Sequence, residues 1–138
     1  MIDFSSEFGK RAERRLKEER IIWLTTVSAS AVPQPRPVWF LWDGSSFLIY
    51  SRPNTFKEQH IQNNPNVALH LDGNGMGGDI VVLTGKAEIA KDAPPANEVP
   101  AYVKKNRNGM DNLNMTPEVF GETYSVPIRV KPLALRGH

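Results

Sequence analysis

The hydrophobic positions of this chain follow two different periods. Near the N-terminus, Phe4, Phe8, Ala12 and Leu16 recur every four residues, and residues 10–20 carry six basic and three acidic side chains. This spacing predicts an amphipathic helix that packs one narrow stripe against a core and leaves its charges in solvent. From residue 21 the chain changes to a continuous run of β-branched and apolar residues, which predicts a buried strand.

Strand patterns then dominate the chain. Residues 38–42 and 47–51 are rich in aromatic and β-branched residues and flank an Asp-Gly-Ser-Ser turn, so we expect an antiparallel hairpin. Residues 67–71 and 79–88 predict two further strands, the second bending near Gly85. Residues 124–130, ahead of a Lys-Pro pair, predict the last strand.

Helix signals are confined to the start of the chain and to connections. Thr55 and Glu58 stand in the T-x-x-E relation of a capping box, so we expect Thr55 to cap a helix that residues 63–65 end. Residues 101–105 predict a short helix ending near residues 106–109. Thr116 followed by Pro117 predicts another helix start.

Together these elements predict a mainly β protein with peripheral helices, built as one antiparallel barrel or sandwich over residues 1–138. The length of 138 residues, 40% hydrophobic and 23% charged, suits one globular domain. No apolar run is long enough to span a bilayer and the N-terminus lacks an export signal, so we expect no membrane insertion. The lack of cysteine excludes disulfides and thiolate chemistry and suits a cytoplasmic location.

Three prolines at alternate positions mark the start of the second strand. In an extended chain, Pro33, Pro35 and Pro37 direct their backbone groups to one edge and remove every donor from it, while Gln34 and Arg36 keep theirs on the other. The prolines either protect a sheet edge from aggregation or leave room for a flat ligand beside the strand.

The segment 51–57 predicts an anion site. It places Arg52 and Lys57 around the start of the helix capped by Thr55, where free backbone amides already attract phosphate. The net charge of +2 is too small to indicate a nucleic-acid partner, so we expect no nucleic-acid binding, even by the basic helix at residues 10–20.

Several other motifs do not predict chemistry. Residues 73–78 satisfy G-x-G-x-x-G, but a strand and not a helix follows, so we interpret them as a hairpin loop. His60, His70 and His138 are too scattered for a metal cluster, and no metal site is expected. No G-x-S-x-G elbow occurs. The three tryptophans are expected in the core or an interface, with Trp39 the best candidate for a ligand contact.

Segments spread over nearly the whole chain have a familiar order and spacing: residues 22–27, Pro33, residues 37–44, 49–51, Lys57 with residues 60 and 61, residues 64–69 and residues 124–130. In these segments the chain resembles the pyridoxamine 5′-phosphate oxidase-like superfamily, and within it the oxidoreductases that use the deazaflavin coenzyme F420. The resemblance implies an antiparallel split β-barrel of the FMN-binding type that pairs as a homodimer, with two cofactor sites between the subunits.

The resemblance also implies a set of cofactor contacts. The ring would lie along residues 34–39, the phosphate would meet Ser51, Arg52 and Lys57, and Arg36 would contact an acidic cofactor tail or reach solvent. His60 would either bond the cofactor or pack against the protein, and Glu58 would lie close enough to weaken anion binding. The full cofactor-binding set is Gln34, Pro35, Arg36, Pro37, Val38, Trp39, Tyr50, Ser51, Arg52, Lys57 and His60. No side chain is implied as catalytic, because the cofactor carries the hydride.

The resemblance therefore implies an F420-dependent oxidoreductase acting on a small planar or conjugated substrate. Two alternatives remain open. One keeps the fold but binds FMN, as an oxidase or flavin reductase. The other is a non-catalytic cofactor or haem carrier, in which His60 or His70 would serve as a haem ligand.

Overall fold

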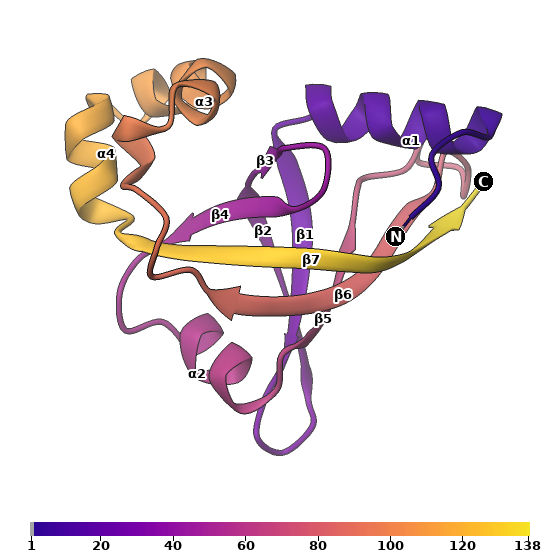
Figure 1. Ribbon diagram of the computed structural model, residues 1–138, viewed down its shortest axis with the longest axis horizontal. Coiled ribbons are helices and arrows are strands. Elements are labelled where there is room, and N and C mark those ends of the chain that lie inside the picture. Colours follow the sequence, from indigo (N-terminus) through magenta and orange to yellow (C-terminus); the bar gives the residue numbers. More distant parts are fainter. Residues whose placement is uncertain (1) are drawn as a thin grey trace.

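Seven strands form one curled antiparallel sheet, and helices cover its ends (Figure 1). The structure is a computed structural model that describes residues 2–138. The elements are α1 (Glu7–Glu18), β1 (Ile21–Val27), β2 (Pro33–Trp39), β3 (Leu41–Trp42), β4 (Phe47–Ser51), α2 (Phe56–Asn63), β5 (Asn66–His70), β6 (Val81–Ile89), η1 (Ala96–Glu98), α3 (Pro100–Asn112), α4 (Pro117–Thr123) and β7 (Val126–Gly137).

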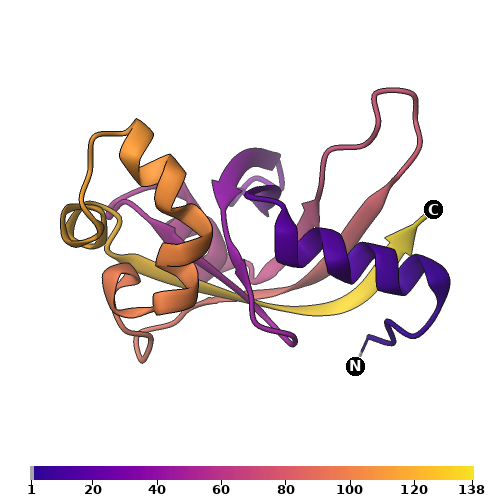
Figure 2. The ribbon, with the colours of Figure 1, turned by 90° about the horizontal axis from the view of Figure 1, so that it is seen from above.

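The strands are arranged in the order β2-β1-β5-β6-β7-β4-β3. Every pairing is antiparallel, so the predicted mainly β architecture with peripheral helices is confirmed. The glycine-rich residues 73–78 connect β5 to β6 as the predicted hairpin loop, which Figure 2 shows projecting from the body of the molecule. No helix within residues 2–138 is long and apolar enough to cross a membrane.

The predicted N-terminal helix is confirmed as α1. Its first turn is capped by Ser6, whose hydroxyl accepts a hydrogen bond from the Gly9 amide at 2.9 Å. Ala12 and Leu16 are fully buried in the main core, which fills the curl of the sheet. The helix lies beside the C-terminal end of β7 (Figure 2).

The bend in the sheet depends on one glycine. The register between β6 and β7 shifts between Thr84 and Gly85, which confirms the bend predicted there. A Cβ atom on Gly85 would lie 2.3 Å from the Lys131 carbonyl oxygen, too close for any other residue. Pro132 pairs opposite Gly85 at this bulge, where a missing backbone donor is tolerated. The prediction that the last strand ends at residue 130 is wrong, because β7 continues past Pro132 to Gly137.

The prolines of β2 lie on a sheet edge, as predicted, because β2 pairs with β1 alone among the strands of residues 2–138. The expectation of one strand over residues 38–42 is wrong. The strand is interrupted at Phe40, which is fully buried. The Phe40 carbonyl accepts a hydrogen bond from Lys105 Nζ at 3.0 Å and not from a neighbouring strand. The short β3 then pairs with β4 as the predicted hairpin.

The Asp-Gly turn between β3 and β4 is closed by its own first residue. The Asp43 carboxylate accepts backbone hydrogen bonds from Ser45 at 2.9 Å and from Ser46 at 2.7 Å. Desolvation opposes ionisation, but these bonds and those from the two serine hydroxyls outweigh it and lower the pKa of Asp43. Gly44 has φ of 98°, a conformation that glycine adopts without strain.

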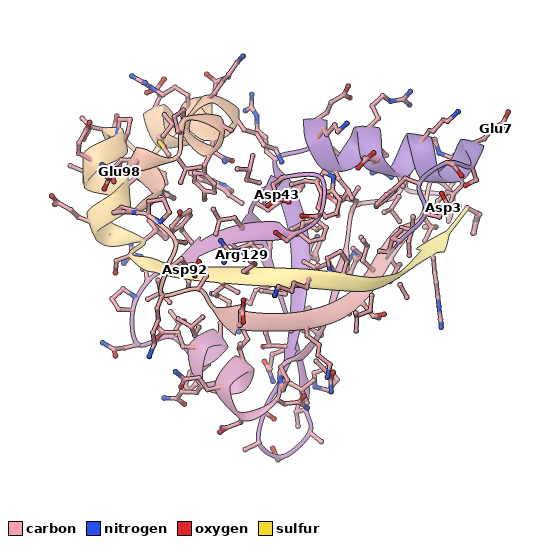
Figure 3. All side chains as sticks on the ribbon, in the orientation of Figure 1. Asp3, Glu7, Asp43, Asp92, Glu98 and Arg129 are labelled. Carbon is pink, nitrogen blue, oxygen red and sulfur yellow. The ribbon has the colours of Figure 1, made fainter. Side chains whose placement is uncertain are left out.

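Helices α3 and α4 form a second layer with its own apolar cluster around Tyr102, packed against β4 and Trp39 (Figure 1). Thr116 caps α4 as predicted, with its hydroxyl accepting from the Val119 amide at 3.2 Å. The expectation that this helix ends near residues 106–109 is wrong, because α3 continues to Asn112. On the connection that enters this layer, Asp92 Oδ1 lies 3.4 Å from Arg129 Nη1 of β7 (Figure 3).

Candidate functional site

A cleft of about 440 Å³ lies between the sheet and the helical layer. Strands β2 and β4 and the segment after β4 form one wall, and α3 with α4 and its flanking residues forms the other. The lining residues are Ile21, Pro37, Val38, Trp39, Tyr50, Ser51, Arg52, Thr55, Lys57, Tyr102, Leu113, Phe120 and Tyr124.

Two cations, Arg52 and Lys57, line the cleft. Lys57, in the first turn of α2, is partly buried, and this desolvation lowers its pKa; the neighbouring Arg36 lowers it further, while Glu58 acts in the opposite direction. Among the described residues, no carboxylate lies within ion-pair distance of Arg36, Arg52 or Lys57. This cluster of positive charge is therefore available to an anion from outside the protein.

Residues 51–55 bring Arg52 and two hydroxyls to the cleft. The Arg52 guanidinium lies over the Tyr124 ring, 5.3 Å from its centroid. The hydroxyls of Ser51 and Thr55 are 3.3 Å apart. Asn54 turns the chain between them with φ of 61°, a conformation that asparagine tolerates better than most residues.

The predicted capping box is not formed. Thr55 does occupy the N-cap position of α2, with extended backbone angles, but its side chain makes no capping hydrogen bond. Glu58 does not reach back to it: its Oε1 atom is buried without a hydrogen-bond partner in residues 2–138, and the side chain lines a different cavity beside Pro94 and Pro127. The first amides of α2 therefore have no side-chain cap, a condition that favours anion binding there.

Flat aromatic rings also line the cleft. Trp39 stacks on Phe120, with ring centroids 5.2 Å apart and planes 9° apart, and Phe120 stacks on Tyr124 at 4.5 Å. Tyr50 donates its hydroxyl to the Pro94 carbonyl at 2.6 Å, and burial raises its pKa to about 12. Gly109 of α3 faces the Trp39 ring so closely that a Cβ atom would lie 2.6 Å from Cζ2.

Most of the predicted cofactor residues lie together. Seven of them line the cleft: Pro37, Val38, Trp39, Tyr50, Ser51, Arg52 and Lys57. Arg36 is exposed on β2, near enough to Lys57 to affect its pKa. Gln34 and Pro35 lie farther along the edge strand and do not line the cleft in this single chain.

His60 does not line the cleft either. Its Nδ1 atom is 2.9 Å from the Thr26 hydroxyl, and its ring stacks on Phe56 with centroids 6.2 Å apart. His70 stacks on Trp23 instead, at 6.0 Å. Within residues 2–138, no three histidine, aspartate or glutamate side chains gather as metal ligands.

The sequence interpretation missed the helical wall: Tyr102, Leu113, Phe120 and Tyr124. One signal was present, because Phe120 and Tyr124 are four residues apart after a clear helix start and so share a face. That face covers Trp39, which lies some 80 positions earlier in the chain. No local sequence pattern indicates this contact.

The donor set of the cleft suits an anionic group attached to a flat ring. Cations, hydroxyls and uncapped amides share the cleft with stacked aromatic faces, the composition typical of a cofactor pocket. Residues 8–123 match the family model described as pyridoxamine 5′-phosphate oxidase. The chain belongs to this family. The split β-barrel expected from the resemblance is therefore confirmed, with the curled seven-stranded sheet as its half-barrel.

Solved structures of the same fold include proteins with different ligands in their names. An F420 reductase is 25% identical, with a TM-score of 0.67 over 90% of this chain and 94% of that one. A FAD-binding protein from Mesorhizobium loti is 16% identical, with a TM-score of 0.65 over 91% and 88%. HutZ, the haem storage protein from Vibrio cholerae, is 9% identical, with a TM-score of 0.64 over 96% and 95%. No curated protein sequence matches the chain.

Proposed function

We propose that this protein is an F420-dependent oxidoreductase that transfers a hydride between the deazaflavin and a small planar or conjugated substrate. The observation that carries the proposal is that one cleft holds stacked aromatic rings together with cations that form no ion pair within residues 2–138. A coenzyme with an anionic arm and a flat ring needs both features. The 25% identity to an F420 reductase over nearly all of both chains supports the choice of deazaflavin.

The residues of the chain would have three roles. Lys57, Arg52 and the Ser51 hydroxyl, with the first amides of α2, would hold the phosphate through charge-assisted hydrogen bonds. The backbone of Pro37 and Val38 would lie beside the ring. Trp39, Phe120 and Tyr124 would keep water away and orient the substrate. The coenzyme itself supplies the hydride chemistry, so no nucleophilic or acid–base triad is required.

Arg36 favours F420 over FMN. A single phosphate can be neutralised by Arg52 and Lys57, yet a third cation lies close to Lys57 and forms no ion pair in residues 2–138. An acidic tail beyond the phosphate would interact with that additional charge. FMN remains the closest rival, because it shares the flat ring and the phosphate.

Titration of the purified protein with F420 and with FMN separates these two functions. We expect the dissociation constant for F420 to be at least tenfold lower than that for FMN, and reduced F420 to be oxidised when an acceptor substrate is added. Tight FMN binding without measurable F420 binding would contradict the proposal and support the FMN-dependent alternative.

The haem-carrier alternative has less support. Its candidate ligands, His60 and His70, do not line the cleft and are engaged with Thr26 and Trp23. The likeness to the haem storage protein, at 9% identity, is one of fold alone.

We also propose that the protein is a homodimer whose partner subunit covers the cleft. Apolar side chains are exposed in and beside the cleft in the single chain: Ile21 and Leu113, which line it, are 38% and 46% exposed, and Phe56, which lies between the lining residues Thr55 and Lys57 in the sequence, is 75% exposed. Exposed apolar residues gathered at one place favour a protein contact. A partner subunit there would bring Gln34 and Pro35 into an enclosed site and exclude water from the ring.

A further inference from the structure

A second, smaller cavity adjoins the cleft. It has a volume of about 270 Å³ and shares three lining residues with the cleft: Ile21, Trp39 and Leu113. The two cavities therefore meet at Trp39, the residue that stacks on Phe120 in the cleft. A molecule in the cleft that extends past Trp39 enters the smaller cavity.

The polar side chains of the smaller cavity can donate hydrogen bonds. Arg20, Asn106 and Asn112 line it beside its apolar residues. Asn106 is only 1% exposed and its amide nitrogen already donates to the Tyr102 carbonyl at 3.0 Å, so we assign it no ligand contact. Arg20 and Asn112 are exposed and accessible to a ligand. Among residues 2–138, none that lines this cavity carries a carboxylate, so the cavity favours a ligand group that is negatively charged and accepts hydrogen bonds.

The end of α1 brings Arg20 to this cavity. The helix ends at Glu18, and Glu19 has extended backbone angles, with φ of −77° and ψ of 145°, so Arg20 does not continue the solvated face of the helix. Arg15, one turn earlier, is paired with Glu19 and Asp79. Arg20 forms no ion pair with any carboxylate of residues 2–138. Its charge is therefore available to an anion in the cavity.

Arg20 is separated from the cations assigned to the coenzyme. It directly precedes Ile21, which pairs with Trp39 across the sheet. Arg36, the cation near Lys57, lies three residues before Trp39 on β2. At ~3.3 Å per residue, these two positions of β2 are roughly 10 Å apart along the strand. A coenzyme whose phosphate and acidic tail are bound by Lys57 and Arg36 leaves Arg20 available to a second molecule.

We propose that Arg20 is a specificity-determining residue that binds a carboxylate of the substrate. The substrate is then a planar conjugated acid, with its carboxylate in the smaller cavity and its conjugated part beside Trp39. This inference rests on the proposed function, in which the coenzyme ring occupies the cleft. A guanidinium matches a carboxylate through two parallel hydrogen bonds, and the Asn112 amide can donate another. Because Arg20 is exposed, solvent screens the interaction and the preference for an acid is modest.

A charged ligand and its neutral counterpart test the inference. Cinnamate and cinnamamide share one planar conjugated skeleton and differ in a carboxylate against a neutral amide. Both are titrated into the protein saturated with oxidised F420, so that Lys57 and Arg52 are already occupied. The indole N–H signal of Trp39 in ¹⁵N NMR spectra reports binding, and Trp39→Phe assigns this signal. We expect the dissociation constant for cinnamate to be roughly threefold to tenfold lower than that for cinnamamide.

Two variants of equal charge assign the preference to Arg20. In Arg20→Gln the ratio of the two dissociation constants should fall to about one, through weaker binding of cinnamate. Arg14→Gln is the matched control, because it removes the same charge from an exposed position of α1 that lines neither cavity, and the preference should remain. Equal binding, or no binding, of the two ligands by the wild type would overturn the inference. A preference that survives in Arg20→Gln, or that is lost equally in Arg14→Gln, would do the same.

The F420 affinity of Arg20→Gln distinguishes the substrate from the coenzyme as the source of the carboxylate. We expect it to equal that of the wild type. A tenfold loss would assign Arg20 to the acidic tail of the coenzyme and overturn the inference. If F420 binds but cinnamate is not preferred, the inference fails and the proposed function stands.

The opposite failure is tested without coenzyme. If the wild type binds neither F420 nor FMN, the proposed function fails, and the two ligands are titrated into Arg52→Ala with Lys57→Ala, which lacks the cations that compete for cinnamate. A cinnamate preference there that disappears on adding Arg20→Gln would support the assignment of Arg20 as a carboxylate-binding residue. The absence of that preference would overturn it.

Discussion

Lys57 combines two conditions that rarely occur together without a ligand. It is partly buried, with its pKa lowered by desolvation and by Arg36, and within residues 2–138 no carboxylate pairs with it. A buried charge without a counter-ion costs free energy, so the site is disfavoured until an anion arrives. A bound phosphate removes this cost, and the free energy recovered strengthens phosphate binding.

Replacing both cations of the cleft should weaken coenzyme binding. In Arg52→Ala with Lys57→Ala, we expect the dissociation constant for F420 to rise at least tenfold, since each charge-assisted hydrogen bond is worth roughly 1.5 to 3 kcal/mol. Fluorescence titration measures this change. Lys10→Ala with Arg14→Ala on the exposed face of α1 is the control, because it removes the same charge far from the cleft. Equal affinities in both double variants would place the phosphate elsewhere.

Lys105 is another partly buried cation and has a structural role. Its ammonium donates to the carbonyls of Phe40 at 3.0 Å and Leu16 at 3.4 Å and lies 3.4 Å from the centre of the Phe40 ring. It thereby joins α3 to the end of α1 and to the break between β2 and β3. Burial lowers the pKa of Lys105 to about 8, although Glu19 acts in the opposite direction.

This shift predicts a stability that rises with pH. Between pH 8 and the ordinary lysine value of 10.5, the unfolded chain binds a proton at Lys105 that the folded protein has released, so higher pH favours the folded state. We expect the free energy of unfolding in urea to increase from pH 8 to pH 10 and to be flatter in Lys105→Met. Above pH 10 the buried tyrosines act in the opposite sense, because their raised pKa lets the unfolded state ionise first. A wild-type stability that falls from pH 8 to pH 10 would contradict this account.

At the scale of elements, the cleft depends on how closely α3 approaches β2. Gly109 allows this approach, because it places bare backbone against the face of Trp39. A glycine within a helix costs roughly 0.5 to 1 kcal/mol relative to alanine, so the tight contact offsets a local penalty. The sequence alone suggested that residues 106–109 end the helix, because glycine and asparagine are typical of helix ends. Tertiary packing against Trp39 overrides that local signal.

Gly109→Ala should therefore destabilise the protein although alanine is the better helix former. The new Cβ atom would lie 2.6 Å from the Trp39 ring, and overpacking of this kind costs roughly 1 to 3 kcal/mol. We expect a lower melting temperature, altered tryptophan fluorescence and weaker coenzyme binding. Asn108→Ala, on the exposed face of the same helix, should be neutral or slightly stabilising. A rise in melting temperature for Gly109→Ala would show that α3 lies farther from Trp39.

Local signals predicted many of the elements and only half of the site. Turn chemistry at Asp43, the cap at Thr116 and the bend at Gly85 depend on near neighbours, and all three are confirmed. The strand wall of the cleft could be predicted for the same reason. The capping box at Thr55 failed, because Glu58 packs toward Pro94 on a distant connection. The helical wall was missed, because its partner surface is determined only by the folded chain.

At the scale of the whole molecule, a single chain leaves apolar residues exposed in and beside the cleft. Phe56 is the most exposed of them, at 75%, and follows directly after the cap of α2. Burying a phenylalanine in an interface is worth roughly 1.5 to 3 kcal/mol. The proposed dimer would bury these residues and enclose the two sites together.

Substitution of Phe56 tests the proposed dimer. We expect the wild-type protein to sediment as a dimer at micromolar concentrations, and Phe56→Gln to weaken self-association roughly tenfold or more. Leu133→Gln is the matched control, since Leu133 is 64% exposed on β7 and neither it nor its chain neighbours line the cleft, whereas Phe56 lies between two lining residues. A wild-type protein that sediments as a monomer over the whole micromolar range would contradict the dimer.

A crystal structure of the protein with F420 tests the central claim most directly. We predict that the phosphate lies within hydrogen-bond distance of Lys57 and Arg52, with the deazaflavin ring beside Pro37 and Val38 and bordered by Trp39. Coenzyme density elsewhere on the protein, with both cations directed into solvent, would contradict the assignment of this cleft.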